Sequence, residues 1–169
     1  MSRPAARWTL LLILALVTGS AGAADSPLMV HTKRLTLHTA YRIAHASLKA
    51  CRDKGVQVAV TVVDRAGNPQ VVLRDTLAPN LTLAVSRRKA YTAAEFGVAT
   101  SKLQNRFKGA YSVGKLDKLM LAPGAVPIEA GGTRLGAVGV AGAPSGQTDE
   151  GCARAGVKAV QTDLEMSGF

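Results

Sequence analysis

Aromatic residues are scarce in this chain. They make up 4% of its 169 residues, whereas apolar residues of all kinds make up 47%. Any core must therefore be filled mainly by valine, alanine, leucine and glycine. Charged residues contribute 19%, and this ratio of apolar to charged residues excludes an intrinsically disordered chain. The length favours a single domain, because compact domains usually contain about 100 to 200 residues.

Familiar catalytic signatures are missing as well. The sequence has no Gly-x-Ser-x-Gly elbow, no Walker loop, no Gly-x-Gly-x-x-Gly at the start of a helix and no His-Glu-x-x-His pair. The acidic residues are scattered, so a catalytic pair of carboxylates is not expected. Basic residues do not alternate with aromatic ones, as a platform for single-stranded nucleic acid requires. These absences favour a binding protein over an enzyme and predict no nucleic-acid partner.

Positive charge is in clear excess. The 21 lysines and arginines outnumber the 11 acidic residues, and the formal net charge is +10. Such an excess is typical of proteins that bind nucleic acid, an anionic surface or an anionic small molecule. Composition alone does not choose among these three classes of partner.

The N-terminus has the pattern of a secretory signal peptide. Arg3 and Arg7 precede an apolar run over residues 8–17 that is too short to span a bilayer, and Ala21-Gly22-Ala23 fits a signal-peptidase site. An uncleaved anchor is the alternative. Export to the periplasm or the medium disfavours genomic DNA as a partner, and no membrane span is expected after cleavage.

The domain organisation follows from this signal. We expect a signal peptide over residues 1–24, an N-terminal segment over residues 25–34 and a single domain over residues 35–169. Cys51 and Cys152 remain in the mature chain, and an oxidising compartment allows them to form one disulfide. Two buried free thiols are the alternative. No Cys-x-x-Cys occurs, so neither a zinc knuckle nor a thioredoxin-type pair is expected.

Hydrophobic periodicity predicts the order helix, hairpin, helix, hairpin, helix. Apolar residues recur at helical spacing after Thr36, a plausible N-cap, and valines alternate with other residues in the strand that follows. The order is typical of an α+β domain with a mainly antiparallel sheet. The expected helices cover residues 37–54, 81–96 and 149–164, the expected strands cover residues 56–64, 70–74, 127–130 and 133–140, and residues 108–124 are expected to be mostly loop.

The first expected helix has a cationic face that could bind a ligand. Neutral imidazole is a good iron ligand, and arginine and lysine suit carboxylates such as haem propionates. A solvated basic face with two ordinary histidines is the alternative, and the two imidazoles are two turns, about 10 Å, apart along the helix. The residues of this face are His38, Arg42, His45, Lys49 and Arg52, with Tyr41 at its border.

Lys89 is a second candidate for a residue that binds a ligand. It shares a packable face of the helix over residues 81–96 with Val85, Thr92 and Phe96. A buried amine needs an acceptor or a bound anion, or else loses its charge. We therefore expect either a structural salt bridge, for example with Glu95 or Asp64, or an anion site in a pocket.

Three stretches of the sequence carry a family resemblance. They read "LTLHTAYRIAHASLKACRDKGVQVAVTVVDRAGN", "SRRKAYTAAEF" and "PGAVPIEAGGTRLGAVGVAGAPSGQTDEGCARAGVKAV". The third is the most specific, because it combines a Pro-Gly-x-x-Pro loop, a Gly-Gly hairpin, a Gly-rich strand and a helix that starts with acids. Together they resemble the GlcG/HbpS-like haem-binding, or haem-degrading, family.

The resemblance implies a fold and two functional hypotheses. The fold is a profilin-like α-β sandwich, with a five-stranded antiparallel sheet flanked by helices, that assembles into homo-oligomers. Some secreted members bind haem and report haem or redox stress to a sensor kinase. The first hypothesis is therefore a secreted haem- or tetrapyrrole-binding protein, with His45 or His38 as axial ligand and weak haem breakdown as a possible side reaction. The alternative is a module that binds a small carboxylate, as in glycolate utilisation.

The resemblance also assigns residues. Lys89 matches a family lysine, and Pro123-Gly124 with Pro127-Ile128 matches a Gly-Gly-x-Pro loop in which Ala125 replaces the second glycine. This adds Lys89, Gly124 and Pro127 to the candidate ligand-binding residues, whereas His38 and His45 do not belong to the family pattern. In such a sheet the first and last strands are antiparallel neighbours. The family fold therefore favours a disulfide between Cys51 and Cys152.

Overall fold

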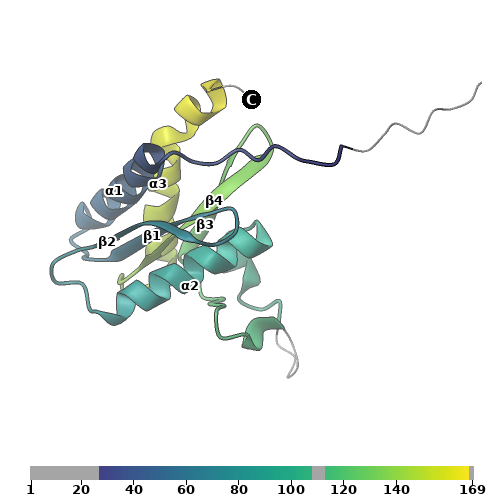
Figure 1. Cartoon of the computed structure of the whole chain (residues 1–169). Helices are drawn as coiled ribbons and strands as arrows, with labels where there is room; N and C mark the ends of the chain where they lie inside the picture. The colour runs from purple at the N-terminus through teal and green to yellow at the C-terminus, as the bar shows by residue number, and fades with distance from the viewer. Residues whose placement is uncertain (1–26, 108–112, 168–169) are drawn as a thin grey trace, which may run out of the picture. The chain divides into compact units, whose positions relative to one another are not determined.

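A computed structural model describes residues 27–107 and 113–167 (Figure 1). The chain divides into two units, of which the first ends at His31 and the second begins at Thr32. Residues 27–31 contain no helix or strand. The signal peptide expected over residues 1–24 lies outside the described residues. No helix in the described part of the chain is long and apolar enough to cross a membrane.

The helices and strands follow the predicted order, in an α+β arrangement. All neighbouring strands are antiparallel, and their order across the sheet is β2-β1-β4-β3. The elements are α1 (Leu37–Arg52), β1 (Ala59–Asp64), β2 (Pro69–Arg74), α2 (Leu81–Phe96), β3 (Ala125–Ala130), β4 (Thr133–Ala141) and α3 (Gly146–Met166), with short 3-10 turns η1 (Thr100–Leu103) and η2 (Val113–Lys115).

The expectation of five strands was wrong, because the sheet formed by the described residues has four. Each of the two hairpins supplies two strands. The connection between α2 and β3 could have supplied a fifth, but its described residues form 3-10 turns and loop instead. That connection lacks the alternation of apolar and polar residues that a half-buried strand requires.

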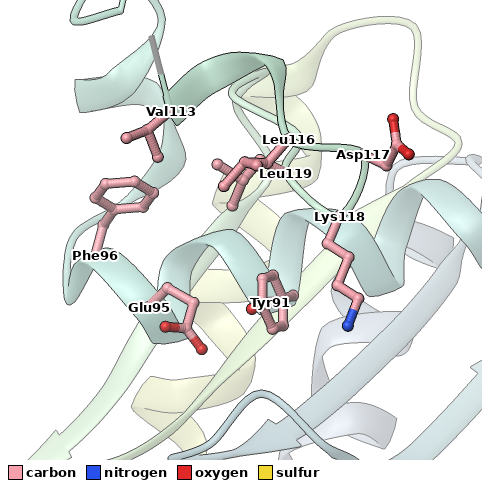
Figure 2. A pocket seen from close by; sticks show the side chains of 8 residues that line it. All are labelled: Tyr91, Glu95, Phe96, Val113, Leu116, Asp117, Lys118 and Leu119. Atoms are coloured by element: carbon pink, nitrogen blue, oxygen red, sulfur yellow. The ribbon is translucent and has the colours of Figure 1, made fainter.

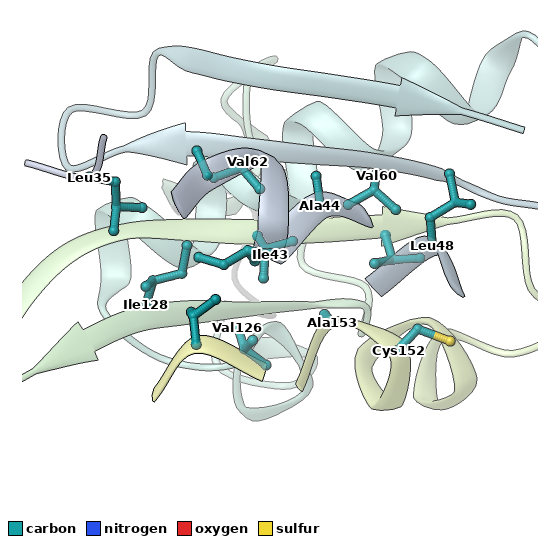
Figure 3. Packing of buried hydrophobic residues seen from close by; sticks show 14 of the residues in the cluster. Leu35, Ile43, Ala44, Leu48, Val60, Val62, Val126, Ile128, Cys152 and Ala153 are labelled. Atoms are coloured by element: carbon teal, nitrogen blue, oxygen red, sulfur yellow. The ribbon is translucent and has the colours of Figure 1, made fainter. Parts of the chain in front are cut away.

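Helices cover both faces of the sheet (Figure 1). On one face α1 and α3 pack against each other and against a core that includes Ile43, Val60 and Ile128 (Figure 3). On the other face α2 packs through small residues such as Ala90 and Ala93. The central strand β1 is therefore buried on both sides, whereas its alternating valines predicted one face in a core.

Side-chain caps fix where two of the helices begin. The Thr36 hydroxyl accepts a hydrogen bond from the Thr39 N–H at 3.2 Å, as expected for the start of α1. The Ser145 hydroxyl accepts one from the Thr148 N–H at 3.1 Å, so α3 begins three residues before the expected start at Asp149. Asp149 consequently lies inside the first turn of α3. Its carboxylate is not needed as the helix cap and can contact another part of the fold.

The disulfide between Cys51 and Cys152 is present, and both side chains are fully buried. Its geometric basis is the one expected, because β1 and β4 are antiparallel neighbours whose register begins with Ala59 opposite Ala141. The bridge joins the end of α1 to the first turns of α3 across a sequence separation of 101 residues. It therefore ties together the two helices of one layer.

We expect the denatured, unreduced protein to contain no free thiol in an Ellman assay. Replacing both cysteines, as in Cys51→Ser with Cys152→Ser, should lower the free energy of unfolding by about 2–5 kcal/mol, because the long loop that the bridge closes is released in the unfolded chain. Urea unfolding measures the loss. Two reactive thiols per denatured chain would contradict the disulfide.

Candidate functional site

The two α1 histidines are exposed, as expected for the cationic face. His45 stacks on Tyr41, with ring centroids 5.8 Å apart and an angle of 23° between the ring planes. His38 lies on the same helix, but no group of three His, Cys, Asp or Glu side chains that could hold a metal ion occurs among the described residues. An iron atom ligated by a histidine of this face would therefore need its other ligands from a bound molecule such as haem.

The cations of the α1 face are already paired with carboxylates. In the tightest of these pairs the Arg52 Nε donates to both Asp75 oxygens, at 2.9 and 3.0 Å, and this guanidinium holds the pKa of the Asp75 carboxyl below its usual value. None of five surface cavities in the described part of the chain is lined by α1. The remaining pairs are Arg42 with Asp163 and Lys49 with Asp53.

Lys89 forms a buried salt bridge. Its Nζ donates to Asp149 Oδ2 at 2.9 Å and to the Val140 carbonyl at 3.2 Å, and the side chains of Lys89 and Asp149 are only 5% and 4% exposed. The Ala143 N–H donates to the other Asp149 oxygen at 3.0 Å. Burial raises the pKa of the Asp149 carboxyl, and the hydrogen bond from Lys89 opposes this effect. Lys89 thus has a salt bridge, and its partner is neither Glu95 nor Asp64.

Sequence reasoning missed Asp149 as the partner because it treated this residue only as the expected start of the last helix. The N-cap of that helix is Ser145 instead. Lys89 and Asp149 are 60 residues apart in the sequence, and no local pattern connects them. The only signal was the position of Lys89 on a face that packs, which requires an acceptor somewhere in the fold.

Gly124, which the family resemblance adds to the candidate residues, lies against Lys89. Its φ is 136°, and a Cβ at this position would come within 2.5 Å of the Lys89 Nζ. Ala125, which follows, has no positive φ, since among the described residues only glycines do. Its replacement of a family glycine therefore strains nothing. Pro127 is not part of this cluster and lines a separate cavity with Lys102 and Arg154.

A small cavity of about 430 Å³ adjoins the buried pair. Lys89 and Asp149 both line it, together with Thr82, Pro123 and Gly142. A carboxylate that entered this cavity would compete with Asp149 for the Lys89 ammonium. The positive charge that the carboxylate hypothesis requires is thus already matched within the chain.

Two larger cavities lie along α2. The first, of about 460 Å³, lies between α2 and residues 113–119, and its apolar side chains face one another across it (Figure 2). The second, of about 500 Å³, lies between α2 and the turn that joins β1 to β2. Tyr91, Asp117 and Lys118 line both cavities, so we treat the two as one feature and name it the α2 groove.

The residues of the α2 groove were not predicted as a site. The apolar part is lined by Tyr91, Glu95, Phe96, Val113, Leu116, Asp117, Lys118 and Leu119. The other part is lined by Ala66, Gly67, Asn68, Ala84, Arg87, Arg88, Tyr91, Asp117 and Lys118.

Removing the charge of Lys89 should destabilise the fold strongly. We expect Lys89→Met to lower the free energy of unfolding by about 3–5 kcal/mol, because Asp149 is left buried without its partner. The double variant with Asp149→Leu should recover much of the loss. Lys49→Met, which removes an exposed cation, is the matched control in urea unfolding. Equal stability of the Lys89 and Lys49 variants would contradict the structural role of the buried pair.

Known proteins are similar to this chain in sequence and in fold. The family model described as haem degrading protein HbpS-like matches residues 35–158. A double mutant of HbpS from Streptomyces reticuli is 35% identical, with a TM-score of 0.75 and coverage of 84% of this chain and 97% of that one. Another HbpS structure is 36% identical, with a TM-score of 0.76 and coverage of 82% and 98%. Among curated proteins no significantly similar sequence was found.

A more distant structure has the same fold. The haem complex of PduOC is 23% identical to this chain, with a TM-score of 0.70 and coverage of 75% and 95% of the two chains. The match to the family model includes α1, the whole sheet, α2 and more than half of α3. Our chain belongs to the family of haem-degrading proteins similar to HbpS.

Proposed function

We propose that this chain binds haem or a closely related tetrapyrrole. Membership of the HbpS-like family supports the proposal, as does the shared fold with a protein solved as a haem complex. Haem combines a flat apolar macrocycle with two carboxylates and an iron that accepts a protein ligand. A fitting site must therefore offer apolar contact, positive charge and a side chain that can ligate iron.

The observation that carries the proposal is the apolar part of the α2 groove. Its volume of about 460 Å³ falls within the range of about 300–1,000 Å³ that is common for small-molecule sites. Two apolar side chains at this cavity, Val113 and Leu116, remain 48% and 60% exposed. Exposed apolar surface rimmed by polar groups is typical of a ligand site. Phe96, Leu116 and Leu119 would hold the macrocycle.

Side chains that could ligate the iron lie on two faces of the molecule. In the groove, Tyr91 lines both cavities, and tyrosine ligates haem iron in catalases. On α1, His45 and His38 are exposed and therefore accessible to haem. The pairing of the α1 cations and the absence of a lining residue from α1 in the five cavities favour the groove.

The alternative of a small carboxylate ligand is less well supported. It depended on Lys89 as the anion-binding group, and this ammonium is bound to Asp149 and to the Val140 carbonyl. Binding a carboxylate there would require the displacement of a buried carboxylate that the protein supplies itself. We therefore propose the tetrapyrrole.

We propose in addition that the chain is exported before it meets its ligand. Residues 1–24 have the pattern of a signal peptide. A fully buried disulfide joins the two helices of one layer, and disulfides persist in oxidising compartments. Self-association and communication with a sensor kinase, which the family resemblance implies, belong to the same proposal.

We expect a saturable Soret shift when haemin is added to a chain that begins at residue 25. Leu116→Asp should weaken binding by about tenfold or more, which is about 1.4 kcal/mol, because it places a charge in the apolar cavity. Leu77→Asp is the control, since Leu77 is 76% exposed and lines none of the five cavities. His38→Ala, His45→Ala and Tyr91→Phe are titrated beside these variants to identify the iron ligand.

Two results would contradict this account. The absence of a saturable shift in the unmodified chain would overturn haem binding itself. A shift that is unaffected by Leu116→Asp but lost in His38→Ala or His45→Ala would keep haem binding and place it on α1.

A further inference from the structure

The α2 groove changes in character along its length. Its end near Phe96 is lined by apolar side chains from α2 and from residues 113–119. Its other end is lined by Arg87 and Arg88, together with the polar turn that contains Asn68. Residues three and four positions apart lie on the same side of a helix, so Arg87, Arg88 and Tyr91 follow one another along the outward side of α2.

The two arginines differ from the cations of the α1 face. Both are exposed, and in the described part of the chain neither guanidinium has a hydrogen bond or an ion pair. Lys118, which lines both cavities, adds a third positive charge. Positive charge that is not matched within the chain and that borders a cavity is suited to an anionic group of a ligand.

Two carboxylates belong to the groove and must be taken into account. Glu95 lines only the apolar part, one turn of α2 beyond Tyr91. Asp117 lines both parts of the groove, and Figure 2 shows its carboxylate pointing away from the apolar side chains. Glu95 disfavours an anion at the apolar end. At the other end the cations Arg87, Arg88 and Lys118 outnumber the single carboxylate of Asp117, so this end favours an anion. The charges of the groove therefore favour one orientation of a bound amphipathic anion.

Tyr91 forms the fixed midpoint of the groove. A Cβ on Gly67 would overlap its ring, which shows that the ring is packed directly against the turn between β1 and β2. Arg88 and Phe96 are eight positions apart, which corresponds to about 12 Å along a helix. An occupant of the whole groove must therefore be an extended molecule with an apolar body and an anionic end.

We propose that the α2 groove binds an amphipathic anion in one orientation, with its apolar body against Phe96, Leu116 and Leu119 and its carboxylates at Arg87 and Arg88. For haem, the carboxylates are the propionates. This inference rests on the proposed function where haemin is the probe, and it names the two arginines as the residues that select for the anionic groups.

The test compares haemin with its dimethyl ester, in which both propionates are esterified and carry no charge. We expect Arg87→Ala with Arg88→Ala to weaken haemin binding about tenfold or more and to leave ester binding unchanged. The unmodified chain should itself bind the ester more weakly than haemin by a similar factor. Arg34→Ala is the matched control, because it removes an exposed arginine that lines none of the five cavities. Arg87→Gln with Arg88→Gln repeats the test with longer side chains if the alanine variant folds poorly.

The outcomes separate this inference from the proposed function. Equal haemin affinity of the double variant and the unmodified chain, or an equal loss for haemin and ester, would overturn the orientation while haem binding stands. If haemin does not bind at all, the proposed function fails, and the groove is tested with anilinonaphthalene sulfonate, an iron-free apolar anion. Its fluorescence should rise with the unmodified chain and rise less with the double variant. No rise, or the same rise for both, would overturn the groove as an anion site.

Discussion

The ion pair between Lys89 and Asp149 connects the two helical layers of this protein. The two side chains come from α2 and α3, which lie on opposite faces of the sheet, and their atoms meet at 2.9 Å. The Val140 carbonyl and the Ala143 N–H complete the hydrogen bonding of the pair. A buried charge that loses its partner is costly, so the position of α2 relative to α3 is strongly specified.

The first turns of α3 are the point where these constraints come together. Asp149 binds Lys89 of α2, and Cys152, three residues later, is bonded to Cys51 of α1. One turn of α3 therefore connects to α1 on its own side of the sheet and to α2 on the other. Neither constraint involves Arg87 or Arg88, which lie on the outward side of α2 and line the α2 groove with Tyr91.

The sequence predicted what depends on local periodicity. The helix over residues 81–96 was predicted with its observed bounds, and both hairpins were predicted as well. The pairing of the first strand with the last was implied by the family resemblance instead. The number of strands was overestimated, because the fifth came from the family resemblance and not from any alternating segment in this chain. The disulfide was predictable once the strand order was assumed, since it depends on topology alone.

The candidate site was harder to predict, because it depends on contacts between residues that are distant in the sequence. The cationic face of α1 was correctly identified as a face, but Asp75 and Asp163, which neutralise two of its arginines, are 23 and 121 residues away from them. Lys89 was identified as a buried cation without its partner. The α2 groove was missed because one of its walls is the loop over residues 113–119, which has no period from which a position could be inferred.

Binding at the groove and binding at α1 differ in the backbone that each would protect. Hydrogen exchange of the chain with and without haemin, followed by mass spectrometry, measures this protection directly. The account predicts slower exchange in residues 81–96 and 113–119, because a ligand in the groove covers α2 and the loop opposite it. Slower exchange confined to residues 37–52 would contradict the account and place the ligand on α1.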